Sequence, residues 1–143
     1  LDGEGRNATY IIQAEKSLIK KLKERLTIIR MAGLVGGERH PVKFMSGKHY
    51  ENGKNKVNLI HLDDCIGIID KVIQENYFGK IINGCTQEHP TKKEYYSWAA
   101  EQLNIPAPTF AENEGKWKEV SNKKSTHSLK YNYKYSSPFD FPI

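Results

Sequence analysis

Short apolar segments alternate with amphipathic helices along this chain, and that order limits the sheet it can form. Segments 26–31, 57–62 and 79–85 are rich in β-branched residues and are predicted strands. Helical spacing of apolar residues predicts a long amphipathic helix over 9–25 and a further helix after each of the last two strands. Strands that are joined through helices pair in parallel by crossovers, so the predicted fold class is α/β.

The predicted strands are few for an independent domain. Sheets usually have about 4–6 strands, and a parallel sheet of three leaves its edges open. By length alone, 143 residues suit one domain, but the chain begins at Leu1 rather than at a methionine. We therefore expect residues 1–143 to form a single partial domain that belongs to a longer protein.

Local signals predict where the helices begin. Asp63 or Asp64 is placed to cap the helix after the second strand by accepting backbone N–H bonds. Thr91 and Glu94 form a capping box at the start of the next helix. The predicted buried stripe of the first of these helices consists of Cys65, Ile66, Ile69, Val72 and Ile73.

The connecting segments have weaker signals. In chain order they are predicted as a turn at 32–33 and 36–37, a short helix at 41–45, a polar surface excursion at 48–56, a loop at 106–115, a short strand at 116–120, and a last helix capped by Ser121 or Asn122 that ends near residue 129.

The formal charge of +5 indicates that attraction to a polyanion has to be considered. Most of the excess lies after residue 115, where the chain has six lysines and only two acidic residues. Lysine and tyrosine alternate over 130–135, as in a stacking platform for single-stranded nucleic acid. The competing interpretation, that this tail packs its rings against the body, is the favoured one, because no basic helix or nucleic-acid motif accompanies the run. Nucleic acid is therefore not an expected partner.

No apolar run approaches the roughly 20 residues of a membrane helix, so no membrane association is expected. Cys65 and Cys85 form neither a disulfide framework nor a metal-ligand pair, and the five histidines lack metal-ligand spacing. We expect no metal and a reducing, cytoplasmic location.

Candidate ligand contacts follow the predicted strands, because ligands in open α/β sheets bind outside the carboxyl ends of the strands. After the first strand, glycines allow close backbone approach, and Arg39, His40 and Lys43 could bind a phosphate or a carboxylate. A tight turn with a solvated basic rim explains this loop equally well. His61 ends the second strand and is a further substrate candidate, against the alternative that it packs beside the helix cap.

Two motifs near the start of the chain match only formally. Residues 3–8 fit the glycine fingerprint of dinucleotide sites, but no strand precedes them, and a linker ahead of a helix is the favoured interpretation. Tyr10 invites a Tyr-x-x-x-Lys interpretation, yet position 14 is alanine. Packing is the expected role of Tyr10.

A family resemblance extends over nearly the whole chain. It rests on residues 27–41 (TIIRMAGLVGGERHP), 58–64 (NLIHLDD), 79–84 (GKIING) and 120–124 (VSNKK), together with Pro90-Thr91 and the helix after it. In this order they resemble the extended short-chain dehydrogenase/reductase superfamily, in its NAD-dependent epimerase/dehydratase group. The chain is most similar there to an atypical bacterial branch of small proteins like nucleoside-diphosphate-sugar epimerases.

The resemblance implies the C-terminal part of a Rossmann-type NAD(P)-binding fold, with parallel strands, crossover helices and a small substrate-side cap. By this likeness Met31, Ala32 and Gly33 contact the nicotinamide end of the cofactor. Asp64 matches an acidic residue that we interpret as structural.

The same resemblance places no catalytic residue in this chain. Alignment on Ala14-Glu15 puts Asn7 at the family's tyrosine position and Ile11 at its lysine position, and Val57 stands in place of a substrate-phosphate arginine. A nucleotide-sugar substrate is therefore in doubt.

The expected function is that of a fragment of an NAD(P)-binding oxidoreductase or epimerase-like protein, inactive alone. Its expected partners are the dinucleotide, a small-molecule substrate, a missing N-terminal half and a second copy in a homodimer. The alternatives are a non-catalytic dinucleotide sensor or scaffold, and a basic nucleic-acid-binding module.

Overall fold

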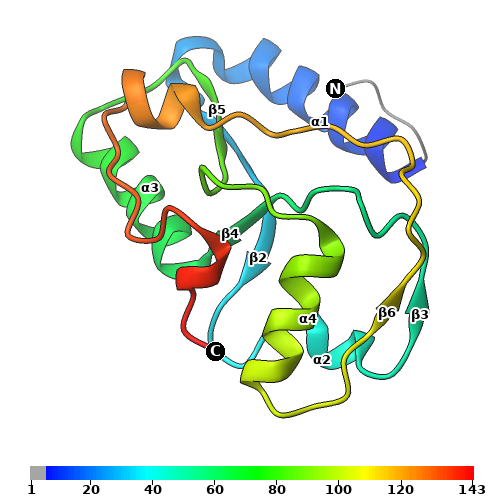
Figure 1. The fold of residues 1–143 in the computed structure, drawn as a ribbon. Coiled ribbons are helices and arrows are strands. Elements are labelled where there is room, and N and C mark those ends of the chain that lie inside the picture. Colours follow the sequence, from blue (N-terminus) through cyan, green and yellow to red (C-terminus); the bar gives the residue numbers. More distant parts are fainter. Residues whose placement is uncertain (1–5) are drawn as a thin grey trace.

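The computed structural model describes residues 6–143, with the side chain of Arg6 left out. The first part of the formal glycine fingerprint, residues 3–5, lies outside the described residues. Along the chain the elements are α1 (Arg6–Leu22), η1 (Lys23–Arg25), β1 (Ile28–Met31), β2 (Gly33–Val35), α2 (Val42–Met45), β3 (His49–Tyr50), β4 (Leu59–His61), α3 (Leu62–Gln74), β5 (Ile81–Gly84), α4 (Lys92–Gln102), β6 (Thr109–Phe110), η2 (Lys124–Ser128) and η3 (Pro138–Asp140) (Figure 1).

Parallel pairing of the main strands confirms the predicted α/β class. β1 pairs with β5 from Ile28 opposite Ile81, and β2 pairs with β4 from Gly33 opposite Leu59. The predicted turn at 32–33 is wrong, because the chain continues from β1 through Ala32 into β2 (Figure 1). The Gly33 amide donates to the Asn58 carbonyl, and a Cβ there would stand 3.0 Å from the Leu59 side chain. This glycine therefore serves close strand packing rather than a turn.

A third parallel pair forms where the sequence predicted surface loops. β3 and β6 align His49 with Thr109 and Tyr50 with Phe110, so the predictions of an excursion at 48–56 and a loop at 106–115 are wrong at these residues. Strands of two residues are too short to show an alternating pattern. The two strands lie side by side at the lower right of the molecule in Figure 1.

The predicted strand at 116–120 is also wrong, because none of these residues is in a strand. The Asn58 side chain takes the place of a neighbouring strand: its Nδ2 donates to the Lys118 carbonyl and its Oδ1 accepts from the Val120 amide. The following helix is a short π-helical turn, η2, whose N-cap Lys123 forms no side-chain cap bond. The predicted residue Ser121 lies two positions before this N-cap, and its hydroxyl accepts the Lys123 amide at 3.3 Å.

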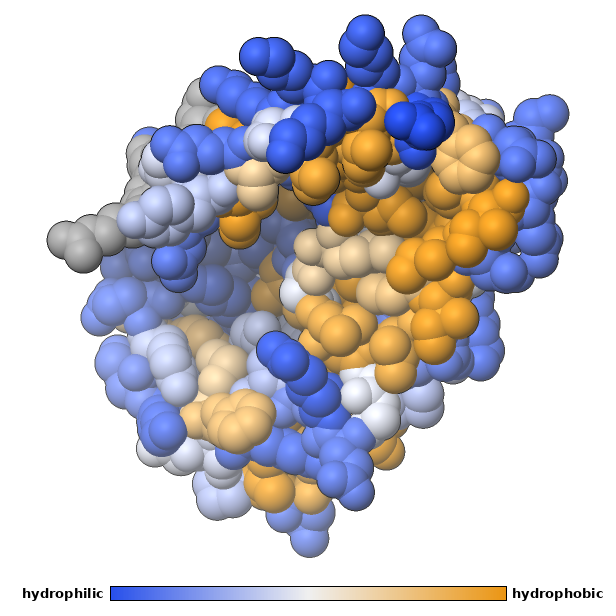
Figure 2. All heavy atoms as spheres, turned by 180° about the vertical axis from the view of Figure 1, so that it is seen from behind, coloured by the Kyte–Doolittle hydropathy of each residue, from blue (hydrophilic) through white to orange (hydrophobic). Residues whose placement is uncertain are grey.

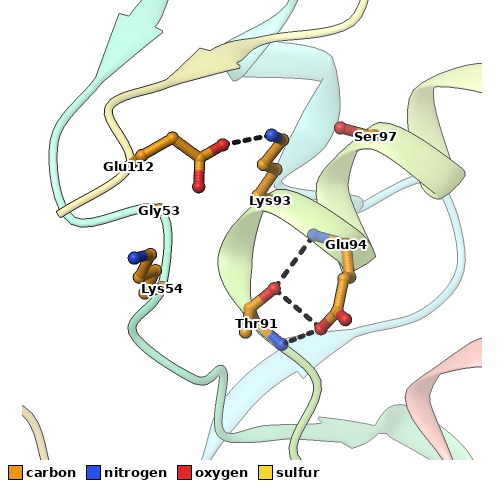
Figure 3. A pocket seen from close by; sticks show the side chains of 7 residues that line it. All are labelled: Gly53, Lys54, Thr91, Lys93, Glu94, Ser97 and Glu112. Carbon is orange, nitrogen blue, oxygen red and sulfur yellow. Dashed lines mark hydrogen bonds and ion pairs between the residues drawn. The ribbon is translucent and has the colours of Figure 1, made fainter. Parts of the chain in front are cut away.

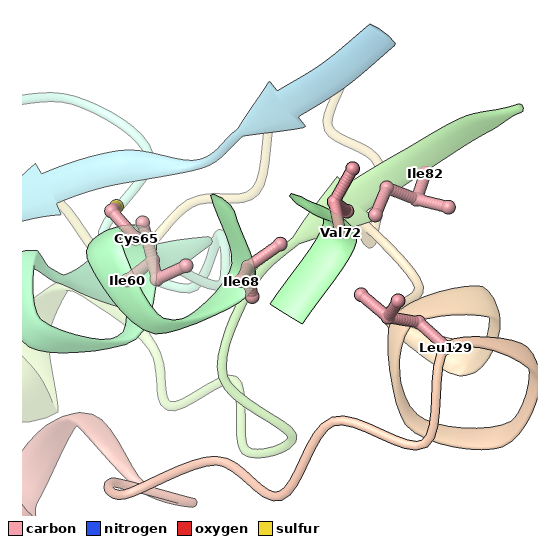
Figure 4. Close-up of a cluster of buried hydrophobic side chains, with 6 residues drawn as sticks. All are labelled: Ile60, Cys65, Ile68, Val72, Ile82 and Leu129. Atoms are coloured by element: carbon pink, nitrogen blue, oxygen red, sulfur yellow. The ribbon is translucent and has the colours of Figure 1, made fainter. Parts of the chain in front are cut away.

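The main core lies between α3, the strands and η2. Its buried members are Ile60, Cys65, Ile68, Val72, Ile82 and Leu129 (Figure 4). The predicted α3 stripe merged two faces, because Ile66, Ile69 and Ile73 point outward with 59%, 46% and 61% of their surface exposed. Cys65, Ile68 and Val72 form the inward face instead.

A second packing region holds together the lower lobe, which consists of α2, β3, α4 and β6. α4 buries Tyr95, Ala99 and Ala100, and the last two pack with Val42 of the predicted short helix. The Thr91–Glu94 capping box is confirmed. The Thr91 side chain accepts the backbone N–H of Glu94, and the Glu94 side chain accepts the backbone N–H of Thr91. The start of this helix could therefore be predicted from residues that lie next to each other in the sequence.

α1 is the predicted amphipathic helix, but its apolar face is open. Ile11 is 56% exposed and Leu18 45%, and Figure 2 shows apolar side chains gathered beside a hollow on this side of the molecule. α1 is tied to β1 by the ion pair of Glu15 with Arg30, at 2.5 Å. All four residues of β1 are only half-buried, and no strand of residues 6–143 pairs with the other edge of β1. No helix in this part of the chain is both long and apolar enough to cross a membrane.

Candidate functional site

The three predicted cofactor contacts lie where β1 passes into β2. Met31 and Ala32 are half-buried against the main core, and the Met31 sulfur packs onto Gly84 of the adjacent strand. Gly33 is exposed. The backbone of Gly33 is therefore accessible to solvent, whereas the position that a Cβ would take packs against Leu59.

His61 ends β4 and is almost fully buried. Its Nδ1 accepts the Asp63 backbone N–H at 3.2 Å, which makes His61 itself the N-cap of α3. The predicted cap by Asp63 or Asp64 is wrong for this reason, since both residues lie in the first helical turn. Rings of Tyr135 and Phe141 pack on the imidazole, with centroids 4.7 and 5.5 Å away.

Arg39 and His40 lie in the loop that follows β2 and have different surroundings. Arg39 is exposed, and its backbone pairs with that of Gly36 in both directions. His40 is buried, and its Nδ1 accepts the Val42 amide at 3.3 Å. The proton therefore sits on Nε2, which donates to the Tyr95 hydroxyl at 2.9 Å. Both ring nitrogens of His40 are occupied.

The β2–β4 register brings the predicted groups to one end of the sheet. Val35 stands opposite His61, and a Cβ on Gly36 would lie 3.0 Å from the His61 Nε2. The His61 ring and the loop that carries Arg39 are therefore neighbours, with Gly33 two residues before Val35 on the same strand. Among the predicted substrate residues, Arg39 is the one whose side chain reaches solvent.

Acid is expected to destabilise the protein through His40. Burial, with a smaller contribution from Lys43, lowers the pKa of His40 from 6.5 to about 4. The unfolded chain then binds more protons between these two values, so the free energy of unfolding falls as the pH is lowered from 6.5 toward 4, by up to about 1.4 kcal/mol per pH unit. Urea unfolding at pH 7, 6 and 5 measures the slope. His40→Gln should flatten it, and an unchanged slope in this variant would contradict the assignment.

Asp64 has the structural role that the sequence suggested. Its carboxylate is fully buried and accepts three bonds from the C-terminal tail: from the Tyr131 hydroxyl at 2.9 Å, the Lys134 amide at 2.7 Å and the Tyr135 amide at 3.2 Å. The Tyr133 hydroxyl bonds to the Ser125 hydroxyl and accepts the Cys85 amide. The interpretation that the tail packs its rings against the body is confirmed.

The two residues that the resemblance aligns with the family's tyrosine and lysine positions lie on α1. Asn7 and Ile11 are exposed on α1, and so is Tyr10. These are the neutral residues that the sequence places at the tyrosine and lysine positions. Within residues 6–143, no group of three or more histidine, cysteine, aspartate or glutamate side chains is arranged to hold a metal ion.

A cavity of 440 Å³ lies in the lower lobe, beside the start of α4 (Figure 3). Its lining consists of Gly53, Lys54, Thr91, Lys93, Glu94, Ser97 and Glu112. Polar groups in it already pair with each other: Lys93 with Glu112, and Thr91 with Glu94. Little bonding capacity is left for a ligand.

A second cavity, of 340 Å³, follows the carboxyl end of β5. It is lined by Gln87, His89, Glu119, Ser121, Asn122, Lys123, Thr126 and His127. This cavity could not be predicted from the sequence, because its lining comes from two segments about thirty residues apart and neither has a motif. The presence of two histidines after predicted elements was the only signal in the sequence.

No protein-family model matches the chain. Protein YeeZ of Escherichia coli K12 is 36% identical over 118 residues, which are 81% of this chain and 43% of that protein. The chain thus spans less than half the length of the curated relatives it matches.

Solved structures share the fold at lower identity. A conserved protein of unknown function from Silicibacter pomeroyi matches with a TM-score of 0.81 and 19% identity, over 96% of this chain and 54% of the other. The dTDP-glucose 4,6-dehydratase of Bacillus anthracis, solved with NAD, matches with a TM-score of 0.75 and 16% identity over 95% of this chain and 49% of that one. The UDP-glucuronic acid 4-epimerase of Bacillus cereus, solved with UDP-glucuronic acid and NAD, matches with a TM-score of 0.72 and 18% identity over 93% of this chain and 48% of that one.

The chain therefore has the fold of a part of the Rossmann-type, NAD(P)-binding epimerases and dehydratases. About half of each such protein corresponds to it, as expected for a C-terminal portion. The dehydratase and the epimerase were solved with NAD. A human epimerase family protein, which matches with a TM-score of 0.63 and 16% identity over 80% of this chain and 45% of the other, was solved with NADPH.

Proposed function

We propose that this chain is the C-terminal part of an NAD(P)-binding, oxidoreductase- or epimerase-like protein and that it completes a Rossmann sheet with an N-terminal half. The open edge of β1 carries the proposal. A parallel strand is normally covered on both faces and paired on both edges unless it is terminal. β1 instead has four half-buried residues and one partner, although Ile28, Ile29 and Met31 are apolar.

The open helix supports the same docking surface. Ile11, Leu18, Ile19 and Leu22 are all exposed along α1, next to the edge of β1. Burial of such side chains contributes about 1.5–3 kcal/mol each, so a surface of this kind favours a partner. An N-terminal Rossmann half would add strands beyond β1 and helices beside α1.

The strand end at Met31–Gly33 fits one end of a dinucleotide. Gly33 is exposed and has no side chain, so a planar ring could approach its backbone closely. The dinucleotide, when bound, supplies hydride transfer. This chain's part is to orient it: Arg39 contributes positive charge toward the substrate, while His40 and His61 hold the loop and the start of α3 in place.

A non-catalytic dinucleotide sensor is the second candidate function. The residues at the aligned tyrosine and lysine positions favour this function. Asn7 has an amide and Ile11 an apolar side chain, and neither can act as the acid that a tyrosine phenol beside a lysine would supply. Both candidates require cofactor binding. They differ in whether any substrate is oxidised or reduced.

Cofactor binding is tested on the full gene product that contains these residues. We expect NADH or NADPH at 100 times its dissociation constant to stabilise the protein by about 2.7 kcal/mol, seen as a raised midpoint of thermal unfolding. ATP at the same concentration is the control, since it shares the adenine and phosphates but lacks the nicotinamide. Absence of a shift with both dinucleotides would refute the proposal.

A further inference from the structure

α3 carries a row of apolar side chains that the core does not use, here called its outer stripe. Its members follow one another at helical spacing and are between 38% and 61% exposed: Leu62, Ile66, Ile69 and Ile73. Single apolar side chains are normal on a surface, but a continuous row on one helix face indicates a contact. Figure 2 shows apolar side chains gathered on the right, which is the side of α3 in that view.

The other sides of α3 that could hold a partner are already covered. One side is buried in the main core. Another faces the C-terminal tail, because the Tyr131 hydroxyl bonds to the Asp64 carboxylate and packs against the backbone of Gly67. Successive residues of a helix are about 100° apart around its axis, so the outer stripe lies on the flank opposite to the tail.

This flank faces the open edge of β1. The carbonyls of Lys80 and Gly84 accept amides of the β1 segment, so the carbonyl of Ile81 points away from β1. It accepts the ammonium group of Lys124 in η2, which places the start of the tail beyond β5. The tail therefore covers the flank of α3 on the side of β5. The outer stripe, on the opposite flank, faces the side where β1 has no partner.

α1 and α3 cover opposite faces of β1. Successive side chains of a strand point to opposite faces of the sheet. Arg30 pairs with Glu15 of α1, whereas Ile29 and Met31 pack into the main core beneath α3. A partner that met only α1 and the edge of β1 would leave the outer stripe in water. A parallel sheet that continues beyond β1 is covered by helices on both faces.

We propose that the outer stripe of α3 binds an amphipathic helix of the N-terminal half, which lies beside α3 on the face of the sheet opposite to α1. That the occupant belongs to this half rests on the proposed function, but the contact itself needs no dinucleotide. The residues that match this chain are 43% of Protein YeeZ, so more than half of that relative lies outside the match and is long enough to supply such a helix.

Charge beside the outer stripe defines the chemistry of the occupant further. Asp70 follows Ile69 on the exposed side of α3. Its carboxylate accepts the Gln74 amide at 2.6 Å and forms no ion pair within residues 6–143. A helix that docks here is therefore expected to carry a lysine or an arginine next to its apolar face, opposite Asp70.

Thiol labelling of the full gene product tests whether the outer stripe is covered. Ile69→Cys places a thiol in the stripe, and Gln74→Cys, on the exposed side of the same helix, is the matched control. Each rate of maleimide labelling is divided by the rate for the same variant unfolded in urea. Labelling of the wild-type protein is subtracted, because Cys65 and Cys85 are free thiols. We expect Ile69→Cys to react at least about 100-fold more slowly than Gln74→Cys, since a covered thiol reacts only after local opening.

A second probe guards against a disturbance by one substitution. Ile66→Cys, one turn earlier in the outer stripe, should be protected to a similar degree, and circular dichroism checks that each variant is folded. Labelling of both stripe variants as fast as that of Gln74→Cys would overturn the inference. Protection that disappears on dilution would overturn it too, because a second copy would then be the occupant.

The same samples separate this inference from the proposed function. Protection of the outer stripe without a dinucleotide-induced shift of thermal unfolding would remove the cofactor function and leave the helix contact standing. A dinucleotide-induced shift together with fast labelling of the stripe would remove the helix contact alone.

Discussion

Asp64→Ala is expected to lower the free energy of unfolding by roughly 3–5 kcal/mol, because it leaves buried donors without an acceptor. The lost carboxylate is fully buried and accepts the Tyr131 hydroxyl and the amides of Lys134 and Tyr135. Urea unfolding followed by circular dichroism measures the change. The C-terminal tail should also become more sensitive to proteolysis, since these bonds tie it to α3.

Asp63→Ala is the matched control, one residue earlier on the same helix. The Asp63 carboxylate bonds to the Lys134 ammonium group at 2.6 Å, but both groups face solvent and screening weakens such pairs. Asp63→Ala should therefore lower the free energy of unfolding far less than Asp64→Ala does. Equal losses for the two substitutions would show that the tail depends on the surface pair rather than on the buried acceptor.

Gly36→Ala is expected to cost about 2–4 kcal/mol and to disturb the end of β4. Gly36 has φ of +140°, a backbone conformation that side chains rarely adopt. A Cβ there would stand 2.7 Å from the Leu62 Cβ and 3.0 Å from the His61 Nε2. The nearest atoms belong to the first residues of α3 and its cap, so neither can shift cheaply.

Gly37→Ala separates conformational strain from this close contact. Gly37 has φ of +59°, and no atom lies within 4 Å of a Cβ built there. The left-handed conformation alone costs an alanine about 1–2 kcal/mol. The difference between the two variants therefore measures the contact with Leu62 and His61 together with the greater backbone strain of an alanine at φ of +140°. A larger loss for Gly37→Ala than for Gly36→Ala would contradict the packing described for this loop.

Local chemistry explains which elements could be predicted. β1, β4 and β5 are runs of apolar, β-branched residues, and the Thr91–Glu94 capping box acts within four residues, so neither depends on distant parts of the chain. β2 was missed because Gly33 signals a turn as strongly as it signals close packing. β3 and β6 depend on each other across about sixty residues, and no local pattern encodes that pairing.

The candidate site, too, could be predicted only where local sequence determines the structure. The end of β4 could be located in the sequence, and with it His61, whereas Met31 and Gly33 were predicted from the family resemblance and lie where β1 continues into β2. The sequence did not show that His40 would be buried against Tyr95 or that His61 would replace the aspartates as the cap of α3. Both outcomes depend on which face each side chain takes after the loop has folded. The polar cavity was missed because residues 87–89 and 119–127 meet only in the folded chain.

The Asp64 cluster also sets the order in which the protein can become stable. Its three donors lie 67, 70 and 71 residues later in the chain, so α3 emerges from the ribosome long before the groups that satisfy its buried carboxylate. Contacts of such large sequence separation form late and slow folding. During synthesis, the Asp64 carboxylate therefore stays solvated by water until the segment from Tyr131 to Tyr135 has been made and can pack against α3.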